Sequence, residues 1–282
     1  MTIDLVGGAI GVSGNQMELI ELAARHGFES VEAKPHDLAV LDNTQREELL
    51  QRMNAKGLVW GAAGLPVDFR QDEERFQDDL KKLPGLMEGL RKVGASRVGT
   101  WLSPCDDTLT YLQNFKQHTR RLREISRILN DHGQRFGLEY VGTFSLRNRR
   151  KYPFIHSMVE VGELIDAIGM GHVGFILDSW HWWSADETAG DIRSLRNDQI
   201  VAVDLNDAPK DVLKKEQQDN RRELPAATGV IDIKSFLRAL EKVGYDGPVR
   251  AEPFNQALRD LDNQEACAVT AKALKQAMAL LD

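Results

Sequence analysis

The sequence predicts one α/β domain, a (β/α)8 barrel (TIM barrel) that spans residues 1–282. Short apolar runs typical of strands alternate with longer amphipathic runs typical of helices, this alternation occurs eight times, and no linker or low-complexity stretch divides the chain. Strands joined by crossover helices run parallel, and eight such units fit a closed barrel. The first strand-to-helix turn, GGAIGVSG, lacks the GxGxxG spacing of an open dinucleotide-binding sheet.

The expected strands follow one another at regular intervals. They are 3–8, 30–34, 58–64, 97–102, 137–142, 173–178, 200–205 and 249–254. The first helix is expected over 15–25, where apolar residues recur at helical spacing and Gly27 follows as a left-handed cap. Asp232 is the expected N-cap of the last-but-one helix. The longest irregular stretch, 206–230, is long enough to indicate a functional loop.

Composition narrows the classes of function. The net charge of −7 argues against nucleic acid as a partner, because phosphate binding depends on clustered Lys and Arg. The basic run at 147–151 is interpreted as a solvated loop. Only two cysteines, Cys105 and Cys267, are present, which favours a reducing compartment, and no apolar run approaches ~18 residues. We therefore expect a cytoplasmic protein without a membrane span.

Four consecutive predicted strands each carry an acid near their carboxyl end. These acids are Glu139, Asp178, Asp204 and Glu252. Taken singly, any of them could be a helix cap or the partner of an arginine. In a barrel, however, the carboxyl ends of the strands meet at one rim, and that rim is where catalytic residues lie.

Four converging carboxylates would repel one another without a cation between them. Neighbouring strands lie ~4.8 Å apart, which is too close for unscreened like charges. Oxygen-rich ligation of this kind suits Mg²⁺ or Mn²⁺ better than a structural zinc ion. The pattern therefore predicts a divalent-metal site, with Mn²⁺ or Mg²⁺ favoured and Zn²⁺ or Co²⁺ as the alternatives.

Several motifs resemble those of the xylose isomerase-like TIM barrel family, the sugar phosphate isomerase/epimerase superfamily. They are GLE at 137–139, D-x-x-H at 178–181, VDLND at 203–207, R-x-L-P…G-V-I-D at 222–232 and the stretch FLRALEKVGYDGPVRAEPF at 236–254. The last of these is the most specific, and the resemblance covers essentially the whole chain.

The resemblance implies a divalent metal held by Glu139, Asp178, Asp204 and Glu252. This chain departs from the pattern at Asp204, because many members read V-H-x-x-D where it reads VDLND. An aspartate can still bind a metal, and an all-carboxylate set shifts the preference towards Mn²⁺ or Mg²⁺. The same change is also compatible with a weakened or lost site.

The resemblance further implies an isomerase or epimerase of a sugar or sugar derivative. Glu139 and Glu252 are the expected catalytic acid and base, which remove a proton next to a carbonyl to give a metal-stabilised enediolate. The alternative is a dehydratase or lyase that uses the same metal and glutamates on a keto-sugar, keto-inositol or 3-keto-glycoside. A non-catalytic barrel and a nuclease of the endonuclease IV type are less favoured, the latter because it needs a basic surface.

Expected substrate contacts come from two loops and from aromatic residues. The resemblance implies that His181 and Arg222 bind substrate oxygens, although the loop after Arg222 reads PAATG where the family usually reads P-G-x-G. Trp101, Trp182 and Trp183 are expected to form a wall against the sugar, since indole rings pack on its C–H face. The expected partner is a small carbohydrate, with no membrane; whether the chain forms a homo-oligomer is left open.

Overall fold

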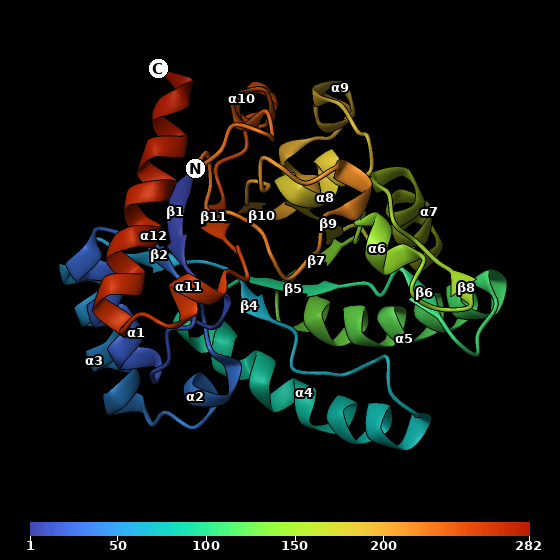
Figure 1. Ribbon diagram of the computed structural model, residues 1–282. Helices are drawn as coiled ribbons and strands as arrows, with labels where there is room; N and C mark the ends of the chain where they lie inside the picture. The colour runs from blue at the N-terminus through green and yellow to red at the C-terminus, as the bar shows by residue number, and fades with distance from the viewer.

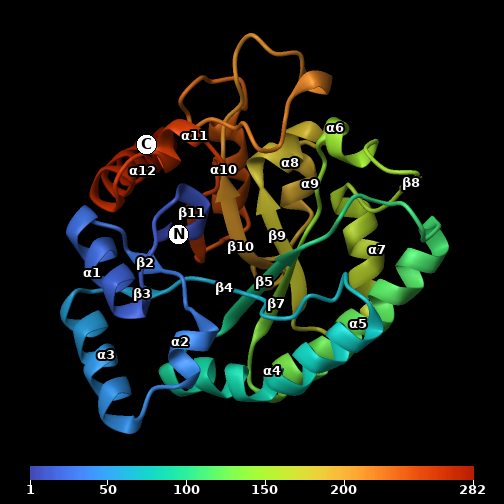
Figure 2. The same ribbon diagram turned by 60° about the horizontal axis from the view of Figure 1, so that its bottom comes forward.

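The computed structural model describes all residues 1–282 and confirms the predicted barrel. Nine parallel strands form its sheet, in the order β3-β2-β1-β11-β10-β9-β7-β5-β4. Their bounds are β1 Thr2–Leu5, β2 Ser30–Val31, β3 Val59–Trp60, β4 Ala63–Gly64, β5 Arg97–Trp101, β7 Arg135–Glu139, β9 Val173–Asp178, β10 Ile200–Leu205 and β11 Pro248–Ala251. Figure 2 shows the strands at the centre of a ring of helices.

The third predicted strand, 58–64, is divided into β3 and β4. β3 pairs with β2 and β4 pairs with β5, and only Gly61 and Ala62 lie between them. The two short strands therefore take the place of one barrel strand, and this segment joins the two ends of the sheet. The eight predicted units and the nine strands of this sheet describe the same barrel.

Helices cover the outside of the strands (Figure 1). The longer ones are α1 Gln16–His26, α3 Asn43–Ala55, α4 Glu73–Val93, α5 Tyr111–Asp131, α7 Met158–Ile168, α10 Ile233–Lys242 and α12 Asn263–Met278. The short ones are α2 Pro35–Ala39, α6 Phe144–Arg147, α8 Ser179–Ser184, α9 Ala189–Arg193 and α11 Gln256–Arg259. None of the helices has the length and the apolar composition needed to cross a bilayer.

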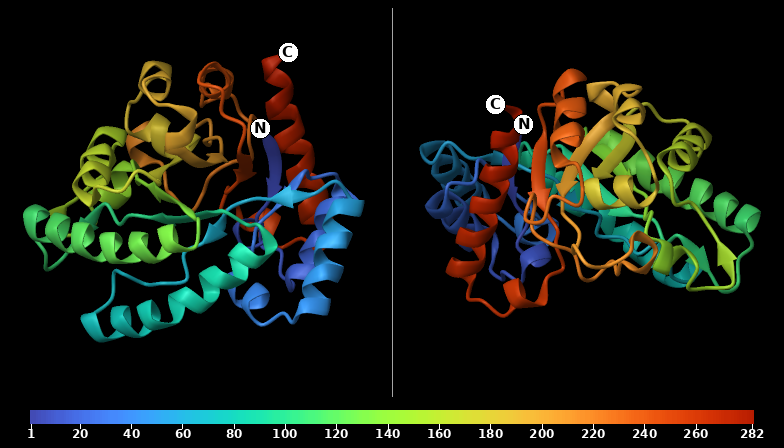
Figure 3. Two further views of the ribbon diagram at one scale, coloured as in Figure 1. Left: turned by 180° about the vertical axis from the view of Figure 1, so that it is seen from behind. Right: turned by 45° about the horizontal axis from the view of Figure 1, so that its top comes forward.

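Helix ends follow the signals in the sequence. The side chain of Asn15 accepts a hydrogen bond from the Glu18 N–H, and α1 stops at Gly27, whose φ of 71° is left-handed. Asp232 caps α10 by accepting from the Ser235 N–H, as expected. The C-terminal helix α12 contacts both α1 and β1, so the two ends of the chain lie together (Figure 3).

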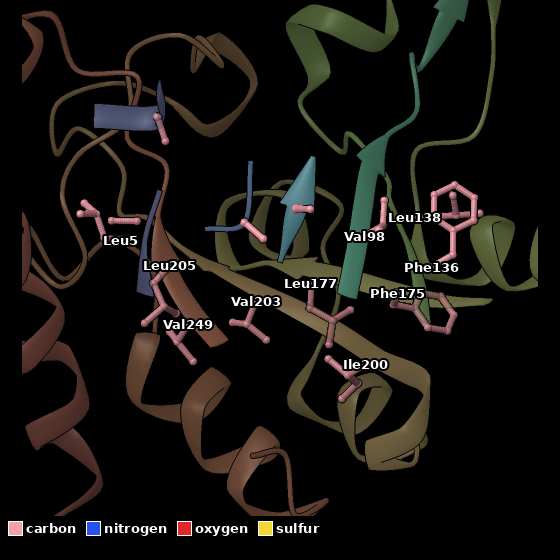
Figure 4. Packing of buried hydrophobic residues seen from close by; sticks show 14 of the residues in the cluster. Leu5, Val98, Phe136, Leu138, Phe175, Leu177, Ile200, Val203, Leu205 and Val249 are labelled. Atoms are coloured by element: carbon pink, nitrogen blue, oxygen red, sulfur yellow. The ribbon is translucent and has the colours of Figure 1, made fainter. Parts of the chain in front are cut away.

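The alternating direction of side chains along the strands places hydrophobic residues in the core and the acids in the candidate site. Leu138, Leu177, Val203 and Leu205 belong to the large hydrophobic cluster drawn in Figure 4. Successive side chains of a strand point to opposite faces, so the residues beside these, the acids Glu139, Asp178 and Asp204, face the interior of the barrel. The loop that follows β10, residues 206–232, contains a short 3-10 turn at Lys214–Glu216, which contacts α6, and an isolated β-bridge between Asp207 and Glu223.

Candidate active site

Glu139 ends β7 and offers a free ligand atom. Its side chain is buried, and its Oε1 has no hydrogen-bond partner. Burial, followed by the negative charge of Glu252, raises its pKa well above the usual range for a carboxyl. A buried carboxylate oxygen without a donor is costly unless something else binds it. The free oxygen of Glu139 can therefore bind a cation or carry a proton.

Asp178 ends β9 and is fixed by three neighbours. Its Oδ1 accepts hydrogen bonds from the Trp180 N–H at 2.8 Å, which caps α8, and from Asn206 Nδ2 at 3.0 Å. Its Oδ2 accepts from Arg222 Nη1 at 2.8 Å. Burial raises the pKa of Asp178 to about 6, and Arg222 opposes that rise. The carboxylate is both a helix cap and a member of the acidic cluster.

Asp204 in β10 has a partner that the sequence did not indicate. Both of its oxygens accept hydrogen bonds from Arg250 of β11, from Nε to Oδ1 and from Nη2 to Oδ2, the second at 2.9 Å. Asp204 is completely buried. The residue at which the sequence is expected to depart from the family pattern is thus one half of a bidentate ion pair.

Glu252 follows the last residue of β11 and is the most accessible of the four acids. Its backbone N–H donates to Asn206 Oδ1 at 3.0 Å, and its Oε2 lies 3.4 Å from Arg222 Nη1. Burial, followed by the negative charge of Asp204, raises its pKa to about 8. Asn206 therefore ties Asp178 to the turn that carries Glu252.

Arg222 and His181 lie above the acids. Arg222 is buried, and its Nη2 donates to Asp219 Oδ1 at 2.8 Å and lies 3.2 Å from His181 Nε2. Because Arg222 has no acceptor, His181 Nε2 accepts this bond and its Nδ1 faces the hydroxyl of Thr143 at 3.5 Å. Burial lowers the pKa of His181 to about 3, so the imidazole is neutral.

A cavity of about 350 Å³ opens above this cluster. Glu139, Glu252, Arg222, His181 and Asp219 line its floor. Its wall and rim include Trp101, Cys105, Val141, Arg149, Arg150 and Phe254. Asp178 and Asp204 lie beneath this floor, where no solvent reaches them. A small molecule in the cavity would therefore meet two glutamates directly.

The three tryptophans expected to form a wall are not equivalent. Trp101 lines the cavity, pairs in register with Glu139 and has the guanidinium of Arg70 4.2 Å above its ring. Trp182 instead packs on Phe236 in the core, and Trp183 lies against Trp180. Neither is among the residues that line the cavity, because α8 starts immediately after Asp178, successive side chains point in different directions, and His181 is the residue of α8 that lines it. Their place in a sugar wall stays a prediction.

In the basic run at 147–151, residues 148–151 are exposed, as expected of a solvated loop, but the run also contributes to the cavity. Arg149 and Arg150 lie at the rim, and the ion pair of Arg150 is with Asp107, whose Oδ2 lies 3.8 Å from its Nε. The sequence also failed to indicate Asp219 and Asn206. The NRR run at 220–222 marks the loop that carries Asp219, and VDLND contains Asn206, but nothing in the sequence shows which partners they have.

The cluster has the donors that a metal ion requires. Two groups of three, Glu139 with Asp178 and His181, and Glu139 with Asp204 and Glu252, each bring ligand atoms within 4.8 Å of one another. Glu139 belongs to both groups, and its Oε1 is unpartnered. Two arginines, Arg222 and Arg250, contact this cluster, whereas its carboxylates are Glu139, Asp178, Asp204, Glu252 and Asp219. When ionised, these acids outnumber the arginines, and a divalent cation would offset the excess negative charge. The residues therefore fit a divalent ion.

Comparison with known proteins places these features in a family. Residues 20–279 match the family described as xylose isomerase-like TIM barrel. A curated relative, the 3-dehydroshikimate dehydratase of Pseudomonas aeruginosa, is 27% identical over 261 residues, which are 89% of this chain and 38% of that protein. The inosose isomerase of Bacillus subtilis is 22% identical, with 90% of this chain and 89% of that protein covered.

Solved structures give the same fold. A xylose isomerase domain protein from Alicyclobacillus acidocaldarius matches with a TM-score of 0.83 and 29% identity, and 96% of each chain is covered. The IolI protein, whose structure contains a zinc atom, matches with a TM-score of 0.80 and 20% identity over 99% of this chain and 98% of that one. This chain spans about two fifths of the length of the dehydratases it matches. The curated relatives are all named as enzymes, as the sequence leads us to expect for this chain.

Proposed function

Since this chain belongs to the xylose isomerase-like TIM barrel family, we propose that it is a divalent-metal-dependent isomerase or epimerase of a sugar or sugar derivative. The observation that carries the proposal is the convergence of Glu139 and Glu252 on the cavity floor, with the unpartnered Oε1 of Glu139 between two groups of ligands. The metal would be held by Glu139, Asp178, Asp204 and Glu252.

Mn²⁺ or Mg²⁺ fits this site best, because its donors are mostly carboxylate oxygens. When bound, such an ion would polarise a substrate carbonyl and stabilise the negative charge that develops on its oxygen. His181 offers the only nitrogen donor in the two groups. Its place above the acids, hydrogen-bonded to Arg222, supports a role in contacting a substrate hydroxyl.

Glu139 and Glu252 are the proposed proton-transfer groups. Both line the cavity, and the pKa of each is raised by burial and by neighbouring negative charge, that of Glu252 to about 8. Carboxyl groups whose pKa values are raised towards neutral pH exchange protons with carbon acids more efficiently than ordinary ones. One glutamate would remove the proton next to the carbonyl, and the other would return a proton to the neighbouring carbon or to the opposite face.

Arg149 and Arg150 support a substrate with an acidic group. They lie at the rim of a cavity whose floor is acidic, and Arg222, the other cation of the cavity, is already paired with Asp178 and Asp219. Arginine forks match carboxylate and phosphate oxygens. A carboxylate or phosphate at the end of the substrate away from the reacting carbon would meet these two side chains.

A dehydratase is the second candidate function, and the same rim arginines favour it. The 27% identical relatives are named 3-dehydroshikimate dehydratase. Elimination begins with the same proton abstraction and differs only in losing a leaving group from the adjacent carbon. Glu252 or His181 would then be the group that faces the departing hydroxyl.

The test is a deuterium exchange experiment. The purified protein, loaded with Mn²⁺, is incubated in D₂O with ketoses, inososes, 3-keto-glycosides and hydroxylated cyclic keto acids, and NMR follows exchange, isomers and eliminated products. Exchange with an isomer as product supports the first proposal, and exchange with loss of water supports the second.

Chelation provides the control. Treatment with EDTA should remove the activity, and Mn²⁺ should restore it. A chain that binds no divalent ion, or whose exchange is unaffected by EDTA, would contradict the proposed metal dependence. Exchange on none of the substrates after metal loading would count against proton abstraction itself.

A further inference from the structure

A row of charged side chains crosses the inside of the barrel at one level. Asp4 of β1 is in register with Arg250 of β11, Arg250 with Asp204 of β10, and Asp204 with Asp178 of β9. Paired residues of neighbouring parallel strands lie ~4.8 Å apart and share a face of the sheet. Arg250 therefore stands between two buried acids and could pair with either of them.

Arg250 pairs with Asp204 and leaves Asp4 without a partner. Both oxygens of Asp204 accept hydrogen bonds from the guanidinium, whereas neither oxygen of Asp4 has a hydrogen-bond partner. Asp204 and Asp4 are both buried. Of these two acids, the one that pairs with Arg250 is also the one that lies among the acids of the candidate site, since Asp204 belongs to that cluster and Asp4 does not.

The ion pair leaves Asp204 able to bind a metal. A carboxylate has about four lone-pair directions on its two oxygens, and a bidentate arginine occupies two of them. One oxygen of Asp204 lies within 4.8 Å of ligand atoms from Glu139 and Glu252. Hydrogen bonding to Arg250 and ligation of a cation are therefore compatible at the same carboxylate.

We propose that Asp204 and Arg250 act as one charge-neutral unit in the metal site, in which Asp204 supplies a ligand oxygen and Arg250 cancels its charge. The inference rests on the proposed function, since it concerns the proposed metal. Because the pair is neutral, it adds no net charge to the other three acids, which is what a neutral histidine, the residue expected here from the family pattern, would also do. Arg250 is in this view not a ligand: it holds the Asp204 carboxylate in place through two hydrogen bonds and offsets its negative charge.

The test measures the affinity of the metal-free protein, residues 1–282, for MnCl₂ by isothermal titration calorimetry. Asp204→Asn removes one negative charge and leaves Arg250 uncompensated, so Mn²⁺ affinity should fall by at least about tenfold, the lower end of the range for altered metal-site partners. Arg250→Gln makes the site more negative and should bind Mn²⁺ more tightly than the unchanged protein. The double variant restores the charge balance and should recover most of the affinity lost in Asp204→Asn.

Other orders of affinity would overturn the inference. Equal affinity of Asp204→Asn and the unchanged protein would mean that Asp204 only anchors Arg250. Equal losses in Asp204→Asn and the double variant would mean that Arg250 has no part in the site. Circular dichroism checks that each variant folds; if the double variant does not, the order of the two single variants decides.

Arg135→Gln is the matched control. Arg135 lies at the opposite end of β7 from Glu139, and its guanidinium donates to backbone carbonyls, including that of Ile200 at 2.9 Å. Its removal should leave Mn²⁺ affinity unchanged. If the unchanged protein itself binds no divalent ion, the proposed function fails together with this inference, whereas a wrong order among metal-binding variants removes this inference alone.

Discussion

The floor and the rim of the cavity are built in different ways. On the floor, the buried Arg222 contacts Asp178, Asp219, Glu252 and His181, so these side chains are fixed by one another, and Glu139 Oε1 is left free for a ligand. At the rim, Trp101 is 48% exposed and Arg149 and Arg150 are exposed. The floor is acidic and ordered by hydrogen bonds, and the rim is basic and open to solvent.

This difference suggests separate roles for the two parts: the floor carries out proton transfer, and the rim selects the substrate. Proton transfer requires groups held in place, and a network of buried hydrogen bonds provides that. Loops at the ends of barrel strands vary without disturbing the core, so the rim can determine which molecule enters. Substitutions on the floor should therefore affect turnover, and substitutions at the rim should affect affinity. The four predictions below test this division.

The largest effect is expected from Glu252→Gln. The amide cannot exchange a proton at the substrate carbon, so the rate of solvent-deuterium incorporation should fall by about 10²- to 10⁴-fold, the usual contribution of a general acid or base. The thermal unfolding midpoint should stay close to that of the unchanged protein, because Glu252 lies outside the hydrophobic cluster. Glu216→Gln, an exposed glutamate in the loop after β10, is the control and should retain full exchange. Exchange at the original rate in Glu252→Gln would contradict its proposed role.

Asp4 tests the layer beneath the floor. Burial raises its pKa to about 7, above the ordinary value of 3.8 that applies in the unfolded chain. Between these two values the folded state binds more protons than the unfolded state, so the free energy of unfolding should fall as the pH rises from about 4 to about 7. Asp4→Asn should remove up to roughly 4 kcal/mol of this fall.

Urea unfolding at a series of pH values measures this effect. The quantity to compare is the change in unfolding free energy between pH 4 and pH 8 rather than the absolute stability, because the amide is also buried. Asp131→Asn, at the exposed end of α5, should retain the full pH dependence. An unchanged slope in Asp4→Asn would show that this carboxyl titrates normally.

A smaller effect is expected at the rim, from the double substitution Arg149→Gln and Arg150→Gln. Hydrogen bonds to charged groups contribute about 1.5–3 kcal/mol, so KM for a substrate with a carboxylate or phosphate should rise by about 10- to 100-fold while kcat changes little. A neutral substrate should be unaffected. Arg238→Gln, on the exposed face of α10, is the control. A loss of kcat with constant KM would place these arginines in the chemistry instead.

The sequence predicts local features of the molecule better than contacts between strands. The barrel and the four acids were predictable because strand alternation and strand ends are local patterns, and Glu139, Asp178 and Asp204 all end or nearly end their strands. That Arg250 would pair with Asp204 was not predictable, because it depends on the register between β10 and β11. Partners across strands are set by the fold as a whole.

The positions of Trp182 and Trp183 show a second limit of prediction from the sequence. After Asp178 the chain enters α8 at once, and side chains that follow one another in a helix differ in direction by about 100°. The sequence gives the aromatic content of this stretch but not the exact start of the helix, on which the direction of Trp182 and Trp183 depends. In the same way, the short basic run 147–151 reveals its charge but not its position beside the cavity.

The smallest effect is expected from Trp101→Ala, which tests whether the rim selects by packing as well as by charge. Trp101 is the one tryptophan that lines the cavity, and Arg70 stacks on its ring. Aromatic packing contributes about 0.5–1.5 kcal/mol, so KM should rise by about three- to tenfold with little change in kcat. Trp101→Phe keeps an aromatic face and should recover most of the affinity. If Trp101→Ala instead lowers kcat as strongly as Glu252→Gln does, the wall takes part in positioning the reacting carbon, and the separation between an ordered floor and a selective rim does not hold at this residue.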